Sequence, residues 1–309
     1  MKTKKKGKRA GRGKSSAVLR AIVSFADALE RSRPRPTENA HRDKKKNYAQ
    51  RLSNNLAILL ANKLRPIKPF GAVLPESDGS GTESGSASGT TKKAKRTDVR
   101  YATATTGLEL LVSIKTLNFR DTKTHRETGT VTFGRYTKNM VRNDHELRAE
   151  AMDHHERFPY AVMVALFFLP VAACDDGEND KSSFAHAVVT FRPRAGRSDP
   201  SDPAAKFERL FIGLYEQDGS PPRVGFVDVM KAPPRRGRPP WPDEQDDPVR
   251  GGKMLTLDEV IAEIVREYGI RNRTYIRWAD EAETGKPPVV VVEADADETE
   301  ENEVNPDSQ

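Results

Sequence analysis

The stretch Tyr160 to Leu169 is the feature that most limits what this chain can fold into. It reads YAVMVALFFL, an unbroken apolar run. A strand with one face in water alternates apolar and polar residues, whereas a strand buried on both faces is apolar throughout. The run is also too short to cross a bilayer. It therefore predicts the central strand of a sheet that is covered on both faces.

Periodicity elsewhere predicts the elements around this strand. Leucines at helical spacing predict a helix from about Asn47 to Leu64, and capping-box patterns predict helix starts at Asn143 and Thr256. These two helices should run to about Arg157 and Tyr268. The order helix, two strands, helix and buried strand indicates an α/β fold, a mixed β-sheet flanked by helices. The other predicted elements are a helix over 16–31 and strands over 70–75, 99–105, 108–119, 184–191, 210–215 and 224–229.

Charge is spread unevenly along the chain. Residues 1–100 carry 25 Lys or Arg against 8 Asp or Glu, and the other 209 residues carry 27 against 37. A basic front can attract a polyanion such as nucleic acid, or it can simply act as a solubilising tail. The chain divides into a basic, partly disordered segment 1–46, a core 47–230 with a flexible Gly/Ser linker at 76–97, a Pro/Arg-rich loop 231–252, a C-terminal helix 253–278 and a mostly disordered acidic tail 279–309.

The single cysteine, Cys174, excludes an intramolecular disulfide and a Cys-rich zinc site. This usage suits a reducing cytoplasm, and the basic N-terminus lacks the apolar core of a signal peptide. The chain has no glycine-rich phosphate loop and no G-x-S-x-G sequence, so ATP-driven and serine-hydrolase chemistry have no support. We therefore expect a cytoplasmic protein without a membrane partner.

Two β-rich segments flank Thr106-Gly107, which is typical of a hairpin turn. A two-residue turn would place Asp98 opposite Lys115, about 5 Å away. Alternation along the second strand would put Ser113 and Glu109 on the same polar face as Lys115, although Glu109 lies about 20 Å along the strand and is excluded from the same site. The opposite face, predicted to face the core, is formed by Leu108, Leu110, Val112 and Ile114.

An Asp beside a Lys on a sheet suits the cleavage of phosphodiesters. The carboxylate can anchor a divalent cation, which polarises the phosphate and lowers the pKa of an attacking water. The ammonium can stabilise negative charge on the phosphate or orient that water. The same pair could be an ordinary ion pair on a solvent-facing sheet, and the hairpin alone does not separate these two interpretations.

Asp98, followed by a strand that ends in Ser113-Ile114-Lys115, resembles the PD-(D/E)xK nuclease superfamily. That family places an Asp at the start of one strand and an acid-x-Lys at the end of the next, on an α-β-β-β-α-β core. The predicted order over residues 47–170 is similar to this core. Thr97 stands where the family has Pro, and Ser113 stands where it usually has a metal-binding acid.

The Ser113-x-Lys115 sequence resembles a subgroup of type II restriction endonucleases, which supply the missing carboxylate from the helix after the strand. The resemblance implies a Mg²⁺-dependent endonuclease that hydrolyses double-stranded DNA, as part of a restriction system and, by analogy, as a homodimer. Asp98 would bind the metal, Lys115 would stabilise the attacking water and phosphate, and Ser113 would hold a water or phosphate oxygen.

Glu146 and Glu150 lie one turn apart on the predicted helix 143–157, and either could supply the second carboxylate. Both could also be solvated helix charges. The helix over 48–64 contains no acid, so a further ligand from that helix would have to be Gln50 or Asn54, or none.

A basic, amide-bearing stretch follows the hairpin, and such groups suit phosphate contacts and base-edge readout. The adjacent His154 and His155 point about 100° apart on a helix, which favours exposed or half-buried helical positions over a metal site. A second class of function is a nucleic-acid-binding or partner-binding protein that keeps the nuclease fold without catalysis, which the lack of an acid at Ser113 favours. The predicted DNA-contacting residues are Tyr136, Lys138, Arg142, Asn143 and Arg148.

Overall fold

The computed structural model describes residues 21–81, 97–104, 106–179 and 181–273, together with the backbone of the short strands at 277–278 and 290–291. The basic start of the chain, most of the predicted Gly/Ser linker and most of the predicted acidic tail lie outside these residues.

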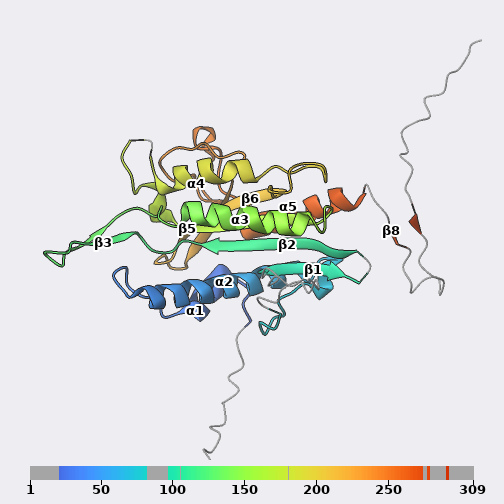
Figure 1. Ribbon diagram of the computed structural model, residues 1–309, viewed down its shortest axis with the longest axis horizontal. Helices are drawn as coiled ribbons and strands as arrows, with labels where there is room; N and C mark the ends of the chain where they lie inside the picture. Colours follow the sequence, from blue (N-terminus) through green and yellow to red (C-terminus); the bar gives the residue numbers. More distant parts are fainter. Residues whose placement is uncertain are drawn as a thin grey trace, which may run out of the picture.

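A five-stranded mixed sheet forms the centre of the molecule (Figure 1). The three inner strands are parallel, and each edge strand is antiparallel to its neighbour. The α/β fold with a mixed sheet flanked by helices is therefore confirmed. In spatial order the strands are β1 (Val99–Thr103), β2 (Gly107–Thr116), β5 (Val162–Pro170), β6 (Arg209–Glu216) and β7 (Arg223–Asp228).

Helices cover both faces of the sheet (Figure 1). Every residue from Val162 to Leu169 is buried, as the apolar run predicts for a central strand. Two hydrophobic clusters fill the spaces between the sheet and its two layers of helices. One layer contains α1 (Phe25–Ser32), α2 (Arg42–Leu64) and α5 (Leu257–Arg273), and the other contains α3 (Met140–His155) and α4 (Ser183–Phe191).

The remaining elements are short. A two-stranded sheet of β3 and β4 lies between β2 and α3 in the chain, and a second one, of β8 and β9, follows α5. The bounds of the short elements are β3 Thr122–Thr124, β4 Val131–Phe133, β8 Arg277–Trp278, β9 Val290–Val291, η1 Phe70–Ala72, η2 Val171–Cys174, η3 Arg192–Arg194 and η4 Pro248–Arg250.

The predicted strand over 184–191 is wrong, because these residues form helix α4. Its apolar side chains recur at Phe184, Ala187, Val188 and Phe191, a spacing of i, i+3, i+4 and i+7 that places them on one helical face. The hydroxyl of Ser182 accepts a hydrogen bond from the backbone N–H of Ala185 and caps the start of the helix. A short apolar run is compatible with both the helical and the strand period, and these residues adopt the helical one.

The predicted strand over 70–75 is also wrong. Phe70–Ala72 form a 3-10 turn, and the extended part is reduced to one bridge between Leu74 and Arg100. The sheet therefore begins at β1, one strand later than the expected core.

Of the two predicted helix starts, one is confirmed and the other is wrong. Thr256 and Glu259 form the predicted capping box at the start of α5, through reciprocal hydrogen bonds. Helix α3 instead begins at Met140 after Asn139, so Asn143 is an interior residue and its predicted role as a cap is wrong. None of the helices among the described residues is long and apolar enough to cross a membrane.

Candidate active site

The hairpin register differs from the predicted one. Val99 pairs with Val112, so the same register carried one residue further brings Asp98 opposite Ser113 rather than opposite Lys115. The predicted pairing is wrong by two residues, because the turn is longer than two residues and the register shifts again within the hairpin.

Asp98 is nevertheless held next to the end of β2. Its Oδ2 atom accepts a hydrogen bond of 2.7 Å from the backbone N–H of Ile114. Its negative charge is also close enough to act on the ammonium of Lys115. Asp98 and Lys115 therefore share one site even though they do not face each other as a cross-strand pair.

The second strand does not have the simple alternation that the sequence suggests. A bulge between Tyr101 and Ala102 shifts the register, and Glu109 hydrogen-bonds the hydroxyl of Tyr268 on α5. Tyr268 packs against the hydrophobic cluster of α1, α2 and α5, whereas Lys115 contacts α3 on the other side of the sheet. The predicted shared face of Glu109 and Lys115 is therefore wrong, which gives a second reason to leave Glu109 out of the site.

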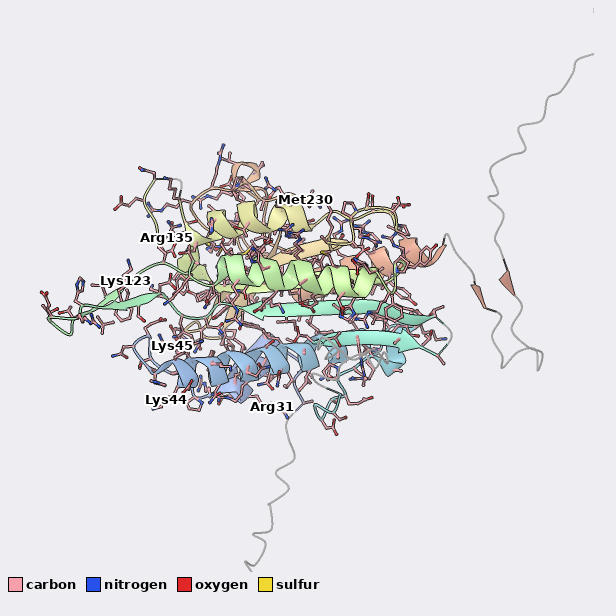
Figure 2. All side chains as sticks on the ribbon, viewed as in Figure 1. Arg31, Lys44, Lys45, Lys123, Arg135 and Met230 are labelled. Carbon is pink, nitrogen blue, oxygen red and sulfur yellow. The ribbon has the colours of Figure 1, made fainter. Side chains whose placement is uncertain are left out.

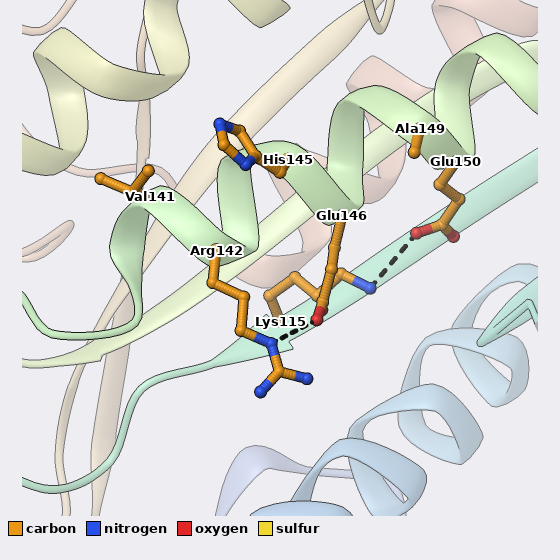
Figure 3. Close-up of a pocket in the computed structure, with 7 residues that line it drawn as sticks. All are labelled: Lys115, Val141, Arg142, His145, Glu146, Ala149 and Glu150. Carbon is orange, nitrogen blue, oxygen red and sulfur yellow. Dashed lines mark hydrogen bonds and ion pairs between the residues drawn. The ribbon is translucent and has the colours of Figure 1, made fainter.

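Helix α3 supplies the closest carboxylate to Lys115 (Figure 3). Oε2 of Glu150 accepts a hydrogen bond of 3.0 Å from the hydroxyl of Ser113 and lies 3.2 Å from Nζ of Lys115. Ser113 is fully buried. Its hydroxyl contacts Glu150 and not, as predicted, a water or phosphate oxygen. The serine thus orients the Glu150 carboxylate beside Lys115.

Lys115 and Glu150 line a hollow with a volume of about 570 Å³ (Figure 3). Glu146, one turn earlier on the same helix, lines it too. Its Oε1 atom is 2.7 Å from Nε of Arg142, in a largely exposed ion pair. Glu146 thus contributes negative charge near Lys115, whereas Glu150 makes the direct contact.

The burial pattern of α3 explains this choice. The side chain of Glu150 is 5% exposed and lies within the stripe of α3 that also contains Leu147, Ala151 and His154. Glu146 precedes Leu147 and lies at the edge of that stripe. The spacing of Leu147 and Ala151 was therefore a signal in the sequence that could have separated the two acids.

The electrostatics of the site keep Lys115 cationic. Burial works against its charged form, but the carboxylates of Glu150 and Asp98 outweigh burial and raise the pKa of Lys115 above its usual value. A lysine that stays protonated is suited to stabilising anionic oxygen and is unsuited to acting as a base.

Glu150 also has an unused acceptor. Its Oε1 atom is buried and has no hydrogen-bond partner in the structure, although Oε2 has two. A buried, unpaired carboxylate oxygen is costly unless something else binds it. No group of three or more His, Cys, Asp and Glu residues in the described parts of the chain could hold a metal ion by itself.

The residues predicted to contact DNA differ in their exposure to solvent. Tyr136 is buried, and its backbone N–H donates to the side chains of Ser183 and Asp176, so its predicted role at a DNA surface is wrong. Lys138, Arg142 and Arg148 are exposed, and Asn143 is half-buried.

The two adjacent histidines are both buried, so the expected exposed or half-buried positions are wrong. Nδ1 of His155 contacts the carbonyl oxygen of Ala204, and its Nε2 lies 3.5 Å from Oε2 of Glu208. Neither ring nitrogen of His154 has a hydrogen-bond partner in the structure, and burial lowers the pKa of His154. Gln50 and Asn54 of α2 hydrogen-bond to each other.

Comparison of this chain with protein-family models, with curated proteins and with solved structures gives no match. The functional assignment therefore depends on the geometry of the site and on the motif in the sequence.

Proposed function

We propose that this protein is a Mg²⁺-dependent endonuclease that hydrolyses double-stranded DNA, of the restriction-endonuclease-like type that the sequence resembles. The observation that carries the proposal is the position of Glu150. It brings a carboxylate from the helix after the hairpin to Ser113 and Lys115, where the S-x-K motif lacks its own acid. Asp98 supplies the other carboxylate of the site.

The side chains present fit Mg²⁺. This ion is usually bound by one or two protein carboxylates, and water and substrate phosphates complete its octahedral coordination. Asp98 and Glu150 would hold it, and the unpaired Oε1 atom of Glu150 is a ligand atom without another role. When bound, the ion would polarise the phosphate and lower the pKa of a water molecule.

The other residues of the site have distinct tasks. Lys115 remains protonated and stabilises the negative charge that develops on the phosphate oxygens. The hydroxyl of Ser113 donates to Glu150 and fixes the orientation of that carboxylate. Arg142 is exposed at the mouth of the hollow, where it can contact the phosphate backbone of a substrate.

The proposal is tested by incubating supercoiled plasmid with Mg²⁺ and the full chain. Lys115→Ala, Asp98→Ala and Glu150→Gln should each lower the cleavage rate about 1000-fold or more, or about 4 kcal/mol in activation free energy. Glu146→Gln is the matched control on the same helix and should stay within about tenfold of the unmodified protein. Discrete bands would indicate a site-specific restriction enzyme, and a smear would indicate a general nuclease.

Two outcomes would contradict the proposal. One is the absence of cleavage on varied DNA substrates by the unmodified protein, and the other is equal cleavage by all the variants. The first outcome, combined with retained DNA binding, would favour the alternative of a non-catalytic nucleic-acid-binding protein.

A further inference from the structure

A β-hairpin projects from the molecule between β2 and α3 (Figure 1). It consists of β3 and β4 with the turn between them, residues 122–133, and we call it the arm. Among the residues that the structure describes, its strands pair only with each other, with Lys123 opposite Thr132. Residues 125–134 are all exposed. A two-stranded hairpin without a hydrophobic layer beneath it is only marginally stable alone, so the arm is not explained by the packing of the core.

The foot of the arm is fixed to the body of the protein. Asp121 and the residues after β4 exchange backbone hydrogen bonds, with Gly134 N–H donating to Asp121 O and Asp121 N–H donating to Arg135 O. The Arg135 side chain lies 3.8 Å from the carboxylate of Asp176, which also accepts from Ser183 at the start of α4. The arm is thus a projecting element on a firm base.

The two faces of the arm differ in chemistry. The register places Phe133 and Val131 on one face, where their side chains are 49% and 37% exposed, and Lys123 with Thr132 on the other. Arg126 lies in the turn at the tip. The segment also contains five threonines, whose hydroxyls can bind phosphate oxygens and base edges.

Basic residues continue from the arm onto the start of α2. Figure 2 labels Lys44 and Lys45 on α2 and Lys123 on the arm, toward the same end of the molecule in that view. The ammonium of Lys45 lies 5.5 Å from the ring centre of Phe119, three residues before the start of the arm, so the two regions are neighbours. None of the following residues forms an ion pair with another residue that the structure describes: Arg42, Lys44, Lys45, Lys46, Lys123 and Arg126.

We propose that the arm enters a groove of duplex DNA while Lys123 and Arg126, together with the basic start of α2, contact the phosphate backbone. This inference rests on the proposed DNA substrate and names the element that binds it. The major groove of B-DNA is about 12 Å wide and admits a two-stranded β-ribbon. Four residues from Asp121 to the turn give the arm a reach of about 13 Å, enough to cross the backbone and enter the groove.

The apolar face of the arm fits the same partner. Apolar side chains in the major groove contact the methyl group of thymine, which gives Phe133 and Val131 a role that the core does not provide. The unpaired cations favour a polyanion over an apolar protein surface, because their charge would have to be neutralised at such a surface.

The test is duplex binding by the full chain in EDTA, where Mg²⁺-dependent cleavage is blocked, measured by fluorescence anisotropy from 50 to 200 mM salt. The double variant Lys123→Ala/Arg126→Ala should bind about tenfold or more weakly, and the slope of log K against log salt should fall by about 1.8 in magnitude, as expected for two lost phosphate contacts. Phe133→Ser should weaken binding without changing this slope.

The matched control is Lys68→Ala/Lys206→Ala, which removes the same charge at the other end of the molecule, after α2 and before β6. It should leave affinity and slope unchanged. Equal losses in the control and arm variants would overturn the proposal, as would unchanged binding by the arm variants. A change of oligomeric state in Phe133→Ser with unchanged DNA binding would show instead that the arm joins two copies of the chain.

The two proposals fail in different ways. If the arm variants lose binding while Lys115→Ala cleaves normally, the DNA-binding role of the arm is supported and the proposed catalytic site is contradicted. If the unmodified protein cleaves DNA and the arm variants bind it normally, the nuclease stands and the arm proposal falls. A complete absence of duplex binding by the unmodified protein at 50 mM salt would overturn both.

Discussion

Two buried glutamates, Glu150 and Glu208, lie in contrasting surroundings. Both oxygens of Glu208 are occupied: Arg197 and Arg271 donate to Oε1 at 2.8 and 3.0 Å, and the backbone N–H of Met163 donates to Oε2 at 2.7 Å. Glu150 has one lysine and one serine on Oε2 and no hydrogen-bond partner on Oε1.

The two carboxylates also lie toward opposite ends of the parallel strands. Glu208 accepts from Met163 at the start of β5, whereas Lys115, the partner of Glu150, is opposite Phe167 near the end of β5. Glu208 ties α5 to the sheet through Arg271 and is sealed from solvent. Glu208 thus has its charge fully paired within the fold, whereas Glu150 has an unpaired oxygen beside a hollow.

The stability of isosteric variants should separate the two glutamates most strongly. Glu208→Gln should lower the free energy of unfolding by about 3–5 kcal/mol, because two buried guanidinium groups lose their counter-charge. Glu150→Gln should change it by about 1 kcal/mol or less, since Lys115 keeps the nearby charges of Asp98 and Glu146. Urea denaturation measures both values. Equal destabilisation would mean that Glu150 is a structural residue like Glu208.

Metal addition should sharpen the same contrast. Mg²⁺ at ten to one hundred times its Kd should stabilise the unmodified protein by about 1.4–2.7 kcal/mol, because it binds the folded chain alone. Glu150→Gln should lose this gain. A thermal shift with and without Mg²⁺ measures the effect, with Glu146→Gln as the control that should retain it. A gain of the same size in Glu150→Gln would place the metal elsewhere.

His154 should respond to pH in the way expected of a buried neutral imidazole. Because burial lowers the pKa of His154, the unfolded chain binds a proton at a higher pH than the folded chain, and stability is lost as the pH falls below about 6.5. His154→Leu should remove this acid-dependent loss and increase stability at neutral pH by about 1 kcal/mol, because two unpaired nitrogens disappear. Urea denaturation at pH 7.5 and 5.5 measures both. An unchanged pH dependence would contradict the assignment.

The smallest effect is expected for the exposed pair of Arg142 and Glu146. Glu146→Gln should cost about 0.3–0.5 kcal/mol of stability, as for other surface pairs at i,i+4. Urea denaturation at low and high salt checks this value, and the difference between Glu146→Gln and the unmodified protein should shrink as the salt screens the pair. A loss above about 2 kcal/mol would give Glu146 a structural role.

Much of the fold could be predicted from local patterns. The apolar run at 160–169, the leucines of α2 and the capping box at Thr256 each specify their element through periodicity or local hydrogen bonds. Each element is found, although α2 begins at Arg42 rather than near Asn47. The strand predicted over 184–191 is wrong because its apolar residues also fit the helical period, and they form α4. The position of Asn143 was misassigned because the helix starts one turn earlier.

The sequence by itself determined the α/β class, the central strand and the residue types of the site, because these follow from side-chain periodicity and chemistry. The tertiary structure alone decided the hairpin register and the face of Glu109. It also decided between Glu150 and Glu146, for which the spacing of Leu147 and Ala151 indicates the buried stripe of α3 but not its contact with Lys115. Register depends on turn length and on a bulge, and over Val99 to Tyr101 the shift of two residues preserves the inward and outward positions, so the hydrophobic pattern could not detect it. Which acid contacts Lys115 depends on the rotation of α3 about its own axis. This rotation is set by the packing of Leu147 and Ala151 against sheet residues that are distant in the sequence.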